Sequence, residues 1–471
     1  MPATTCRAPF VAIRLAPDGG VYACGVNSVQ RFGDLGERSL SEIWTGPELE
    51  AFRATLAGGT FPRGCHDCRE AVTAGQRHVS HAAVYDEFPD PTDVAWPQRI
   101  EFALSNTCNL QCVQCNGGLS SAIRAQREHR PPLRSAYGDE FFDDVRTFLP
   151  HLRIATFIGG EPFLMRECRR VWDLMIELGV TPYVHVTTNG TVWNDRVERY
   201  LHELKMSVAI SIDAVDPATM ASIRVGSDLA EVQANRDRFL AATRSYGGDF
   251  SINHCVMPQN WREFMPFLLE ADELDVLVLN ARVLRPHEFS LFSLPAAQLR
   301  EVVEGMRAQE AADGAALGAN RVAWDTTLAD LTTHLSALEG EPVPVELRRL
   351  PAADTDALAR IFADVISATG VPPVHLELAF GHIESITVPQ WAEHLGLERC
   401  VDMESAAMLA VVEQELGTEI RLVESSEGPG LHRYRYTIDP EGQPTHLDVL
   451  AVEPDDDRPG HADVLISRVP S

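Results

Sequence analysis

Between Pro97 and about residue 286, stretches with the pattern of β-strands alternate with stretches that have the pattern of helices. Strands that are separated by helices pair in parallel through right-handed crossovers. We therefore expect an α/β fold of six βα units, an open partial barrel rather than the closed form with eight. The expected strands are Arg99–Leu104, Arg153–Ile158, Tyr183–Thr188, Ser207–Ile212, Phe250–Met257 and Val276–Arg282. The expected helices include Glu167–Leu178, Trp193–Glu203, Asp228–Thr243 and Trp261–Glu270.

Three closely spaced cysteines follow the first expected strand. They are Cys108, Cys112 and Cys115, in Cys-x3-Cys-x2-Cys spacing. Three thiolates can hold three irons of a [4Fe–4S] cube and leave the fourth iron without a protein ligand. Such an open position lets a metal centre react rather than only brace a fold. Structural zinc is the alternative, and it suits the triplet poorly because no fourth ligand lies nearby.

Glycines and polar residues stand at the ends of the next three expected strands, where the chemistry gathers in folds of this kind. Glycine lets the backbone approach a ligand closely, a carboxylate accepts hydrogen bonds from an ammonium group, and arginine pairs with carboxylates. Each segment alone fits ordinary capping of a strand end, but their order along the barrel indicates one ligand site. The residues expected there are Gly159, Gly160, Glu161, Thr188, Asn189, Ser211, Asp213 and Arg224.

Four more cysteines precede the expected barrel. The segments Val11–Leu15 and Val21–Ala23 predict a hairpin that brings Cys6 and Cys24 towards one end. Two further cysteines, Cys65 and Cys68, follow on an expected loop. The spacing of these four permits a structural zinc site as well as an iron–sulfur cluster.

The bulk composition limits where the protein works and what it binds. No run of about 18 apolar residues and no basic-then-apolar N-terminal segment occurs, so we expect a cytoplasmic protein without a membrane partner. Because the cytosol keeps thiols reduced, the ten cysteines indicate metal or cluster ligands rather than disulfides. The formal net charge of −28 repels phosphate backbones and disfavours nucleic acid as a partner.

Over roughly Pro97–Leu294 these motifs resemble the core of the radical S-adenosylmethionine (SAM) superfamily. The resemblance rests on CNLQC-VQC, GGEP, TTNG and SID with a following arginine. It implies a (β/α)6 partial barrel, a [4Fe–4S] cluster on the three cysteines that SAM chelates, and SAM contacts at the strand ends. It also implies an electron donor such as flavodoxin or ferredoxin. The sequence departs from the family at Gln114, where an aromatic residue usually stacks on the adenine.

The early cysteines resemble the auxiliary-cluster modules of this superfamily, called SPASM and, in the shorter form, twitch. Four ligands are enough for one closed [4Fe–4S] cube, so the twitch form fits better, and its position before the barrel resembles the N-terminal-twitch subgroup. We expect residues 1–95 to form this module, 96–294 the barrel, 295–349 a helical connection and 350–471 a small α+β domain. In that last domain the patterns predict helices at Asp354–Ala368 and Glu404–Leu416 and strands at His432–Ile438 and His446–Val452.

Three functions are compatible with the sequence. The first is a radical SAM enzyme that abstracts hydrogen from a peptide or protein substrate and oxidises or crosslinks it. The second is a radical SAM dehydrogenase of a small metabolite such as an aminocyclitol or sugar. The third is a non-catalytic scaffold that binds zinc. Cys255, on the fifth expected strand, is a candidate hydrogen-atom or proton donor, although buried cysteines commonly act as small hydrophobic residues.

Overall fold

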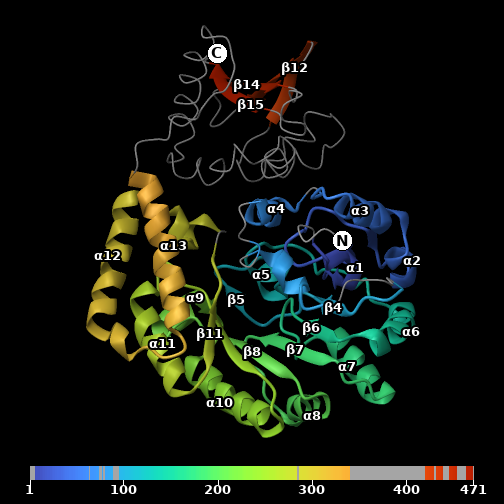
Figure 1. Ribbon diagram of the computed structural model, residues 1–471, viewed down its shortest axis with the longest axis vertical. Helices are drawn as coiled ribbons and strands as arrows, with labels where there is room; N and C mark the ends of the chain where they lie inside the picture. Colours follow the sequence, from blue (N-terminus) through green and yellow to red (C-terminus); the bar gives the residue numbers. More distant parts are fainter. Residues whose placement is uncertain are drawn as a thin grey trace. The chain divides into compact units, whose positions relative to one another are not determined.

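The computed structural model describes residues 6–62, 64–73, 77, 80–88, 95–283 and 286–339, and four strands between Ile420 and Val469. The chain divides into two compact units, Met1–Ser336 and Ala337–Ser471. Figure 1 shows the first unit as a sheet with helices along its outer side. Among the described residues, no helix is long and apolar enough to cross a bilayer.

Six parallel strands form the centre of the first unit, as the alternating pattern predicts. In spatial order they are β11, β10, β8, β7, β6 and β4, so neighbours in the sheet follow one another along the chain apart from the short β5 and β9. The sheet does not close on itself, which agrees with the predicted partial barrel. The bounds are β4 Arg99–Phe102, β6 Ile154–Phe157, β7 Tyr183–Thr188, β8 Ser207–Ser211, β10 Phe250–His254 and β11 Leu277–Asn280.

Three strands from the N-terminal segment continue this sheet beyond β4. Strand β1 (Ala12–Leu15) pairs in parallel with β4, and β2 (Gly20–Tyr22) pairs antiparallel with β1. The short β3 (Gly33–Asp34) completes the edge, which gives nine strands in all. The expected hairpin therefore forms, and it lies in the same sheet as the barrel strands.

Helices cover one face of the central sheet. Phe102 on β4 stacks on Phe157 of β6 with ring centroids 4.8 Å apart, and Phe157 lies 5.3 Å from Trp172 of helix α7. Side chains alternate between the faces of a strand, so the neighbours of these phenylalanines point inward, away from the helices. The covering helices are α6 Asp139–Phe148, α7 Arg166–Leu178, α8 Asp195–Leu204, α10 Leu229–Tyr246 and α11 Phe264–Glu273.

The N-terminal segment adds short helices around its hairpin. Helix α2 begins with a capping box, in which the hydroxyl of Ser39 accepts from the N–H of Glu42 and the Glu42 carboxylate accepts in return. This segment also holds a 3₁₀ turn, His81–Tyr85, that leads towards β4. The helices are α1 Ala8–Val11, α2 Leu40–Trp44, α3 Pro47–Ala57 and α4 His66–Thr73. Cys68 therefore lies on a helix rather than on the expected loop, because α4 begins directly after Cys65.

Several short elements were not predicted. They are α5 Ser121–Gln126, α9 Pro217–Ile223, the antiparallel pair β5 Gln111–Cys112 and β9 Arg224–Val225, and 3₁₀ turns at Leu149–His151, His287–Phe289, Leu291–Ser293 and Gly314–Ala316. The expected helix Trp261–Glu270 occurs as a 3₁₀ turn, Trp261–Glu263, followed by α11. The barrel is followed by α12 (Ala296–Asp313) and α13 (Arg321–Glu339), as the helical patterns predict.

The second unit contains a four-stranded antiparallel sheet. Its strands run in chain order as β12 Ile420–Gly428, β13 Leu431–Ile438, β14 Thr445–Val452 and β15 Asp463–Val469. The two predicted strands correspond to β13 and β14. The predicted helices at Asp354–Ala368 and Glu404–Leu416 lie outside the described residues.

Candidate functional site

The cysteine triplet lies on a loop that crosses from β4 to the end of α9. Part of this loop, β5, pairs antiparallel with β9, so that Cys112 stands opposite Arg224. The N–H of Val113 extends the contact by donating to the carbonyl of Ile223 at 2.9 Å. The loop turns back at its end, where the N–H of Cys115 donates to the carbonyl of Cys112 at 3.1 Å. The triplet is thus fixed to a segment more than one hundred residues away in the sequence.

Serine and asparagine side chains also form hydrogen bonds with the backbone of this loop. The Ser121 hydroxyl lies 3.1 Å from both the N–H and the carbonyl oxygen of Cys108. The Ser120 hydroxyl donates to the Leu110 carbonyl at 2.7 Å, and the Asn106 amide donates to the Gly117 carbonyl at 2.9 Å. Sequence analysis missed these supports, although Ser120 carries an ordinary signal as the N-cap of α5.

The three thiols of the triplet share one environment. Burial raises the pKa of all three, that of Cys115 to about 11. The charge of Cys112 further raises the pKa of Cys108, and the charges of Cys112 and Cys108 further raise that of Cys115. A bound cation would instead lower the pKa of these thiols, because coordinating thiols lose their protons.

Glu161 ties the GGEP turn to the end of β7. Its side chain is fully buried. One carboxylate oxygen accepts from the N–H of Phe163 at 3.1 Å and the hydroxyl of Thr188 at 2.9 Å, and the other accepts from the N–H of Asn189 at 2.7 Å. Burial raises the pKa of Glu161 to about 7. A contact between this carboxylate and a ligand stays a prediction, since the described contacts give it a role in positioning the two strand ends.

The glycines of this turn allow it to touch the loop before the triplet. A Cβ on Gly160 would lie only 2.3 Å from the carbonyl oxygen of Thr107. Gly159 has a φ of +108°, a backbone conformation that residues other than glycine rarely adopt. The N–H of Glu161 donates to that same Thr107 carbonyl at 2.8 Å. Both glycines are therefore explained by close backbone packing beside Cys108.

Asn189 links the end of β7 to the triplet. Its amide nitrogen lies 3.8 Å from the sulfur of Cys108 and donates to the side-chain oxygen of Asn109 at 3.0 Å. Its own amide oxygen accepts from the Thr191 hydroxyl at 2.7 Å. The structure thus brings the third predicted strand end beside the first.

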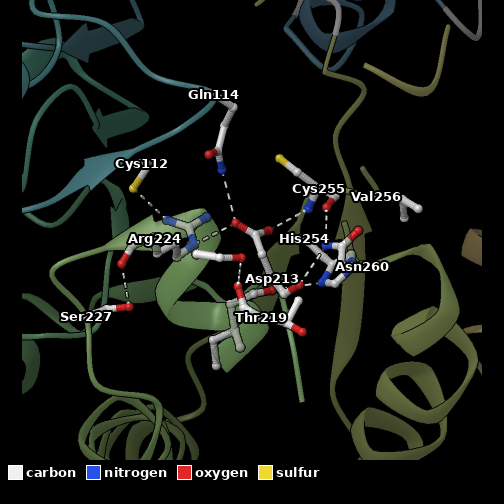
Figure 2. A network of polar contacts seen from close by, with 12 residues as sticks. Cys112, Gln114, Asp213, Thr219, Arg224, Ser227, His254, Cys255, Val256 and Asn260 are labelled. Carbon is white, nitrogen blue, oxygen red and sulfur yellow. Dashed lines mark hydrogen bonds and ion pairs between the residues drawn. The ribbon is translucent and has the colours of Figure 1, made fainter. Parts of the chain in front are cut away.

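A buried ion pair joins the fourth strand end to the triplet (Figure 2). The Nε of Arg224 lies 2.7 Å from the Oδ2 of Asp213, whose side chain is fully buried. Another nitrogen of Arg224 lies 3.8 Å from the sulfur of Cys112. The negative charges of Asp213 and Cys112 raise the pKa of Arg224 against the opposing effect of burial. The predicted pairing of Arg224 with a ligand carboxylate stays a prediction, and Asp213 already balances its charge.

Asp213 also receives hydrogen bonds from three neighbours. The Gln114 amide donates to Oδ2 at 3.1 Å, and the N–H of Cys255 donates to Oδ1 at 2.7 Å. The Asn260 amide donates to the Asp213 backbone carbonyl at 2.7 Å. Sequence analysis missed Asn260, which has no motif signal. Ser211, also expected in the site, lies buried at the end of β8.

Cys255 lies at the edge of this network. Figure 2 shows its sulfur directed away from Asp213. The residue packs against a small apolar cluster of Ile223, Met257 and Val283. Burial raises the pKa of its thiol to about 12, so the group is a neutral thiol at pH 7. Its proposed role as a hydrogen donor stays a prediction.

The four early cysteines also come together. Burial raises the pKa of Cys6 and of Cys65 to about 12, and the charges of the other thiols in the group raise both further. The buried Asn27 supports two of them, because its N–H lies 3.4 Å from the sulfur of Cys24 and its amide nitrogen 3.3 Å from that of Cys65. Sequence analysis missed this asparagine.

The chemistry of these donor sets fits iron–sulfur clusters. Both groups consist of thiols, the soft donors that hold such clusters. Among the described side chains, no three His, Cys, Asp or Glu residues are grouped so that they could hold a single metal ion. The fit therefore rests on the type and number of donors, three in one group and four in the other.

Two family models match this chain. The model of the SPASM iron–sulfur cluster-binding domain matches residues 6–69, which include all four early cysteines. The model of the radical SAM superfamily matches residues 102–271, which include the triplet and every strand-end residue named above. Residues 102–271 thus form a radical SAM domain, and residues 6–69 a SPASM-like domain. As a radical SAM protein with a SPASM-like domain, the chain has iron–sulfur clusters and SAM as its implied cofactors.

Curated relatives of this radical SAM protein match over part of their length. The GTP 3′,8-cyclase of Aeromonas hydrophila is 23% identical over 151 residues, which cover 30% of this chain and 42% of that protein. The enzymes of the same name from Clostridium botulinum and Mycolicibacterium smegmatis are 24% and 28% identical, over 43% and 39% of their lengths. The match thus spans less than half of each relative.

Two solved structures also match parts of this chain. The Streptococcus suis protein SuiB bound to its precursor peptide SuiA is 14% identical with a TM-score of 0.34, over 67% of this chain and 71% of that one. The protein anSMEcpe with bound AdoMet is 18% identical with a TM-score of 0.33, over 46% of this chain and 60% of that one.

Proposed function

We propose that this protein is a radical SAM enzyme that takes a hydrogen atom from a peptide or protein substrate and oxidises or crosslinks it. The observation that carries the proposal is the triplet loop, on which three thiols lie beside the ends of β6, β7 and β8. When bound there, a [4Fe–4S] cluster and SAM would supply the 5′-deoxyadenosyl radical by reductive cleavage. The protein's own groups position these cofactors.

The triplet itself would hold three irons and leave one iron free for SAM. Cys108, Cys112 and Cys115 offer three thiolates, one fewer than a closed cube needs. Asn189 and Arg224 each place a nitrogen 3.8 Å from one of these sulfurs, where a hydrogen bond stabilises the thiolate form. These two residues therefore orient the ligands as well as joining the strand ends.

The Asp213–Arg224 pair would keep the radical site dry and rigid. Both side chains are at least nine-tenths buried, at 0% and 10% exposure. Asp213 holds Arg224 on one side and the backbone of Cys255 on the other. A buried network of ion pairs and hydrogen bonds has little freedom to move, and it excludes water that would quench a reactive intermediate.

The SPASM-like module would act as an electron acceptor or a scaffold. Its four thiols, Cys6, Cys24, Cys65 and Cys68, are enough to close every iron of one cube. A closed cube cannot bind a substrate directly through iron, so electron transfer from a substrate radical is favoured. Such transfer makes the overall reaction a two-electron oxidation of the substrate.

Two observations bear on the substrate. The chain has a second compact unit, Ala337–Ser471, that could hold a larger substrate, which favours a peptide or protein. The curated relatives are named for a reaction of GTP, which supports a small metabolite as the second candidate. A short precursor-peptide gene beside this one would favour the first candidate.

An electron carrier with an acidic surface would reduce the triplet cluster. Residues 102–138 contain four arginines and one acidic residue, Glu128, in a chain whose net charge is −28. Arg127 is exposed, and its guanidinium donates to the carbonyls of Gln111 at 3.4 Å and Cys112 at 3.2 Å. A positive surface at the cluster loop attracts an acidic partner such as a flavodoxin or ferredoxin.

Iron and sulfide analysis tests the proposal. Anaerobically reconstituted protein should contain about eight irons, and replacing Cys108, Cys112 and Cys115 by alanine should leave about four. SAM-dependent release of 5′-deoxyadenosine should disappear in the same variant. Cys168→Ala is the matched control, because Cys168 is buried on α7 outside both thiol groups. Tightly bound zinc without iron would instead support a scaffold and overturn the proposal.

A further inference from the structure

A row of polar side chains crosses the inward face of the central sheet. The strand register pairs Arg14 with Glu101, Glu101 with Thr156, Thr156 with His185, and His185 with Ser207. Side chains at paired positions point to the same face of a sheet. This face is the one turned away from the covering helices, where apolar side chains would be expected in an ordinary core.

Two neighbouring residues of this row, Arg14 and Glu101, form an ion pair. The Nε of Arg14 lies 3.0 Å from the Oε1 of Glu101, and the two side chains are 20% and 16% exposed. A second nitrogen of Arg14 donates to the carbonyl of Gly25 at 2.7 Å. Arg14 therefore neutralises the charge of Glu101, and few of its N–H groups remain to bind a third group.

Arg99 adds a second positive charge on this face, and its charge, together with that of Arg14, opposes the rise that burial causes in the pKa of Glu101. It stands two residues before Glu101 on β4, so its side chain points to the same inward face. Within the described part of the chain its guanidinium makes no hydrogen bond or ion pair, and it lies 5.8 Å from the centre of the Tyr85 ring. Burial, followed by the charge of Arg99, lowers the pKa of His81 and of His185, so both imidazoles are neutral at pH 7.

The same place borders the loop that carries an auxiliary cysteine. Gly25 directly follows Cys24, and a Cβ on Gly25 would lie 3.5 Å from the Oε1 of Glu101. The charge of Glu101 raises the pKa of Cys24, which confirms that the two groups are close. A molecule held at Arg99 would thus lie between the inward face of the barrel sheet and the SPASM-like module.

We propose that Arg99, beside the Arg14–Glu101 pair, binds a carboxylate of the substrate on the inward face of the sheet. The proposal rests on the proposed function and adds the chemical class of its substrate. The charges of Arg14, Arg99 and Glu101 sum to +1, which one carboxylate neutralises. A guanidinium presents two parallel N–H groups that match the two oxygens of a carboxylate.

Chemical labelling of the reconstituted full-length protein tests this site without any radical reaction. Phenylglyoxal modifies arginine side chains that are unpaired and within reach, and peptide mass spectrometry reports the rate at each residue. N-acetylglycine is the carboxylate probe, and N-acetylglycinamide is its neutral match. We expect the carboxylate to slow labelling of Arg99 about tenfold while the amide has no effect. Arg196, an exposed residue on α8, is the control and should react equally in all samples.

Variants test the same site by equilibrium binding of radiolabelled N-acetylglycine. Arg99→Gln should weaken binding about tenfold, Arg99→Lys should weaken it less, and Arg196→Gln should leave it unchanged. Equal protection of Arg99 by the acid and the amide, or unchanged binding in Arg99→Gln, would overturn the proposal. Protection of Arg99 in a protein that fails to cleave SAM would retain the carboxylate site and reject the radical SAM activity instead.

Discussion

Cys112 and Arg224 stand opposite each other in a two-stranded antiparallel pair, and Arg224 in turn lies 2.7 Å from Asp213 at the end of β8. This relationship joins the first strand end of the barrel to the fourth through one buried guanidinium. A change in any of the three residues should therefore affect the others.

Removing the carboxylate of Asp213 should destabilise the fold strongly. Asp213→Asn leaves the guanidinium of Arg224 buried without a counter-charge, which costs about 3–5 kcal/mol of unfolding free energy. Urea denaturation measures this loss. Glu270→Gln breaks the more exposed pair between Arg236 and Glu270 and should cost less than about 1 kcal/mol. Equal costs for the two variants would contradict a special role for the buried pair.

Glu161 should make stability depend on pH between its unfolded and folded pKa values. Burial raises its pKa from 4.5 to about 7, so over this range the folded state binds more protons than the unfolded state. Stability should therefore be highest below pH 4.5, as far as this group is concerned, and fall as the pH rises towards 7. The loss is on the order of 3 kcal/mol.

Comparison with Glu161→Gln isolates this contribution. The amide does not titrate, so the difference in unfolding free energy between the two proteins should change across that pH range and be constant above it. The variant should also be less stable at low pH, because its NH₂ group faces an N–H donor of Phe163 or Asn189. A difference that does not vary with pH would exclude the raised pKa.

A methyl group on Gly160 should displace the triplet loop. In Gly160→Ala the new Cβ would lie 2.3 Å from the Thr107 carbonyl, which is backbone and cannot rotate away. We expect the iron content after reconstitution to fall from about eight towards about four. Gly138→Ala is a suitable control, since no atom lies within 4 Å of the added Cβ. Full iron content in Gly160→Ala would show that the loop adapts.

Reversing the charge of Arg127 should slow reduction by an acidic electron carrier. At low salt we expect the rate of flavodoxin-dependent SAM cleavage to fall about tenfold in Arg127→Glu, and the difference to shrink as salt screens the surface. Arg196→Glu changes the net charge equally at an exposed position on helix α8 and should retain the rate. Reduction by dithionite should be equal in all three proteins. A matching loss with dithionite would mean that the substitution damages the cluster loop itself.

The sequence predicted the barrel strands well because each lies between stretches with a clear helical pattern. All six occur within a few residues of their expected bounds, and β7 has the expected bounds. The short pair β5–β9 escaped prediction because each strand has two residues, too few to show a period. The four-residue strand β1 was expected in a hairpin, but its parallel pairing with β4 depends on contacts between distant segments.

The candidate site likewise contains residues that the sequence predicted and residues that only the structure revealed. The spacing predicted the triplet and the four early cysteines as cluster ligands, since thiols are the soft donors that commonly hold iron–sulfur clusters. Asn27 and Asn260 carried no such signal, because an asparagine becomes significant only through the atoms that surround it. The same holds for Arg99, whose lack of a hydrogen bond or ion pair within the described residues is visible only once its neighbours are known.

The sequence by itself determined the number and order of the barrel strands and the residues that can bind iron. Both follow from local properties, namely apolar periodicity and the reactivity of thiols. Only the tertiary structure decided that Arg224 faces Asp213 and Cys112, that the Glu161 side chain is fully buried, and that the Arg99 guanidinium makes no hydrogen bond or ion pair within the described residues. Such pairings depend on which distant side chains share a buried space, where a charge must find an opposite charge or remain available for a ligand.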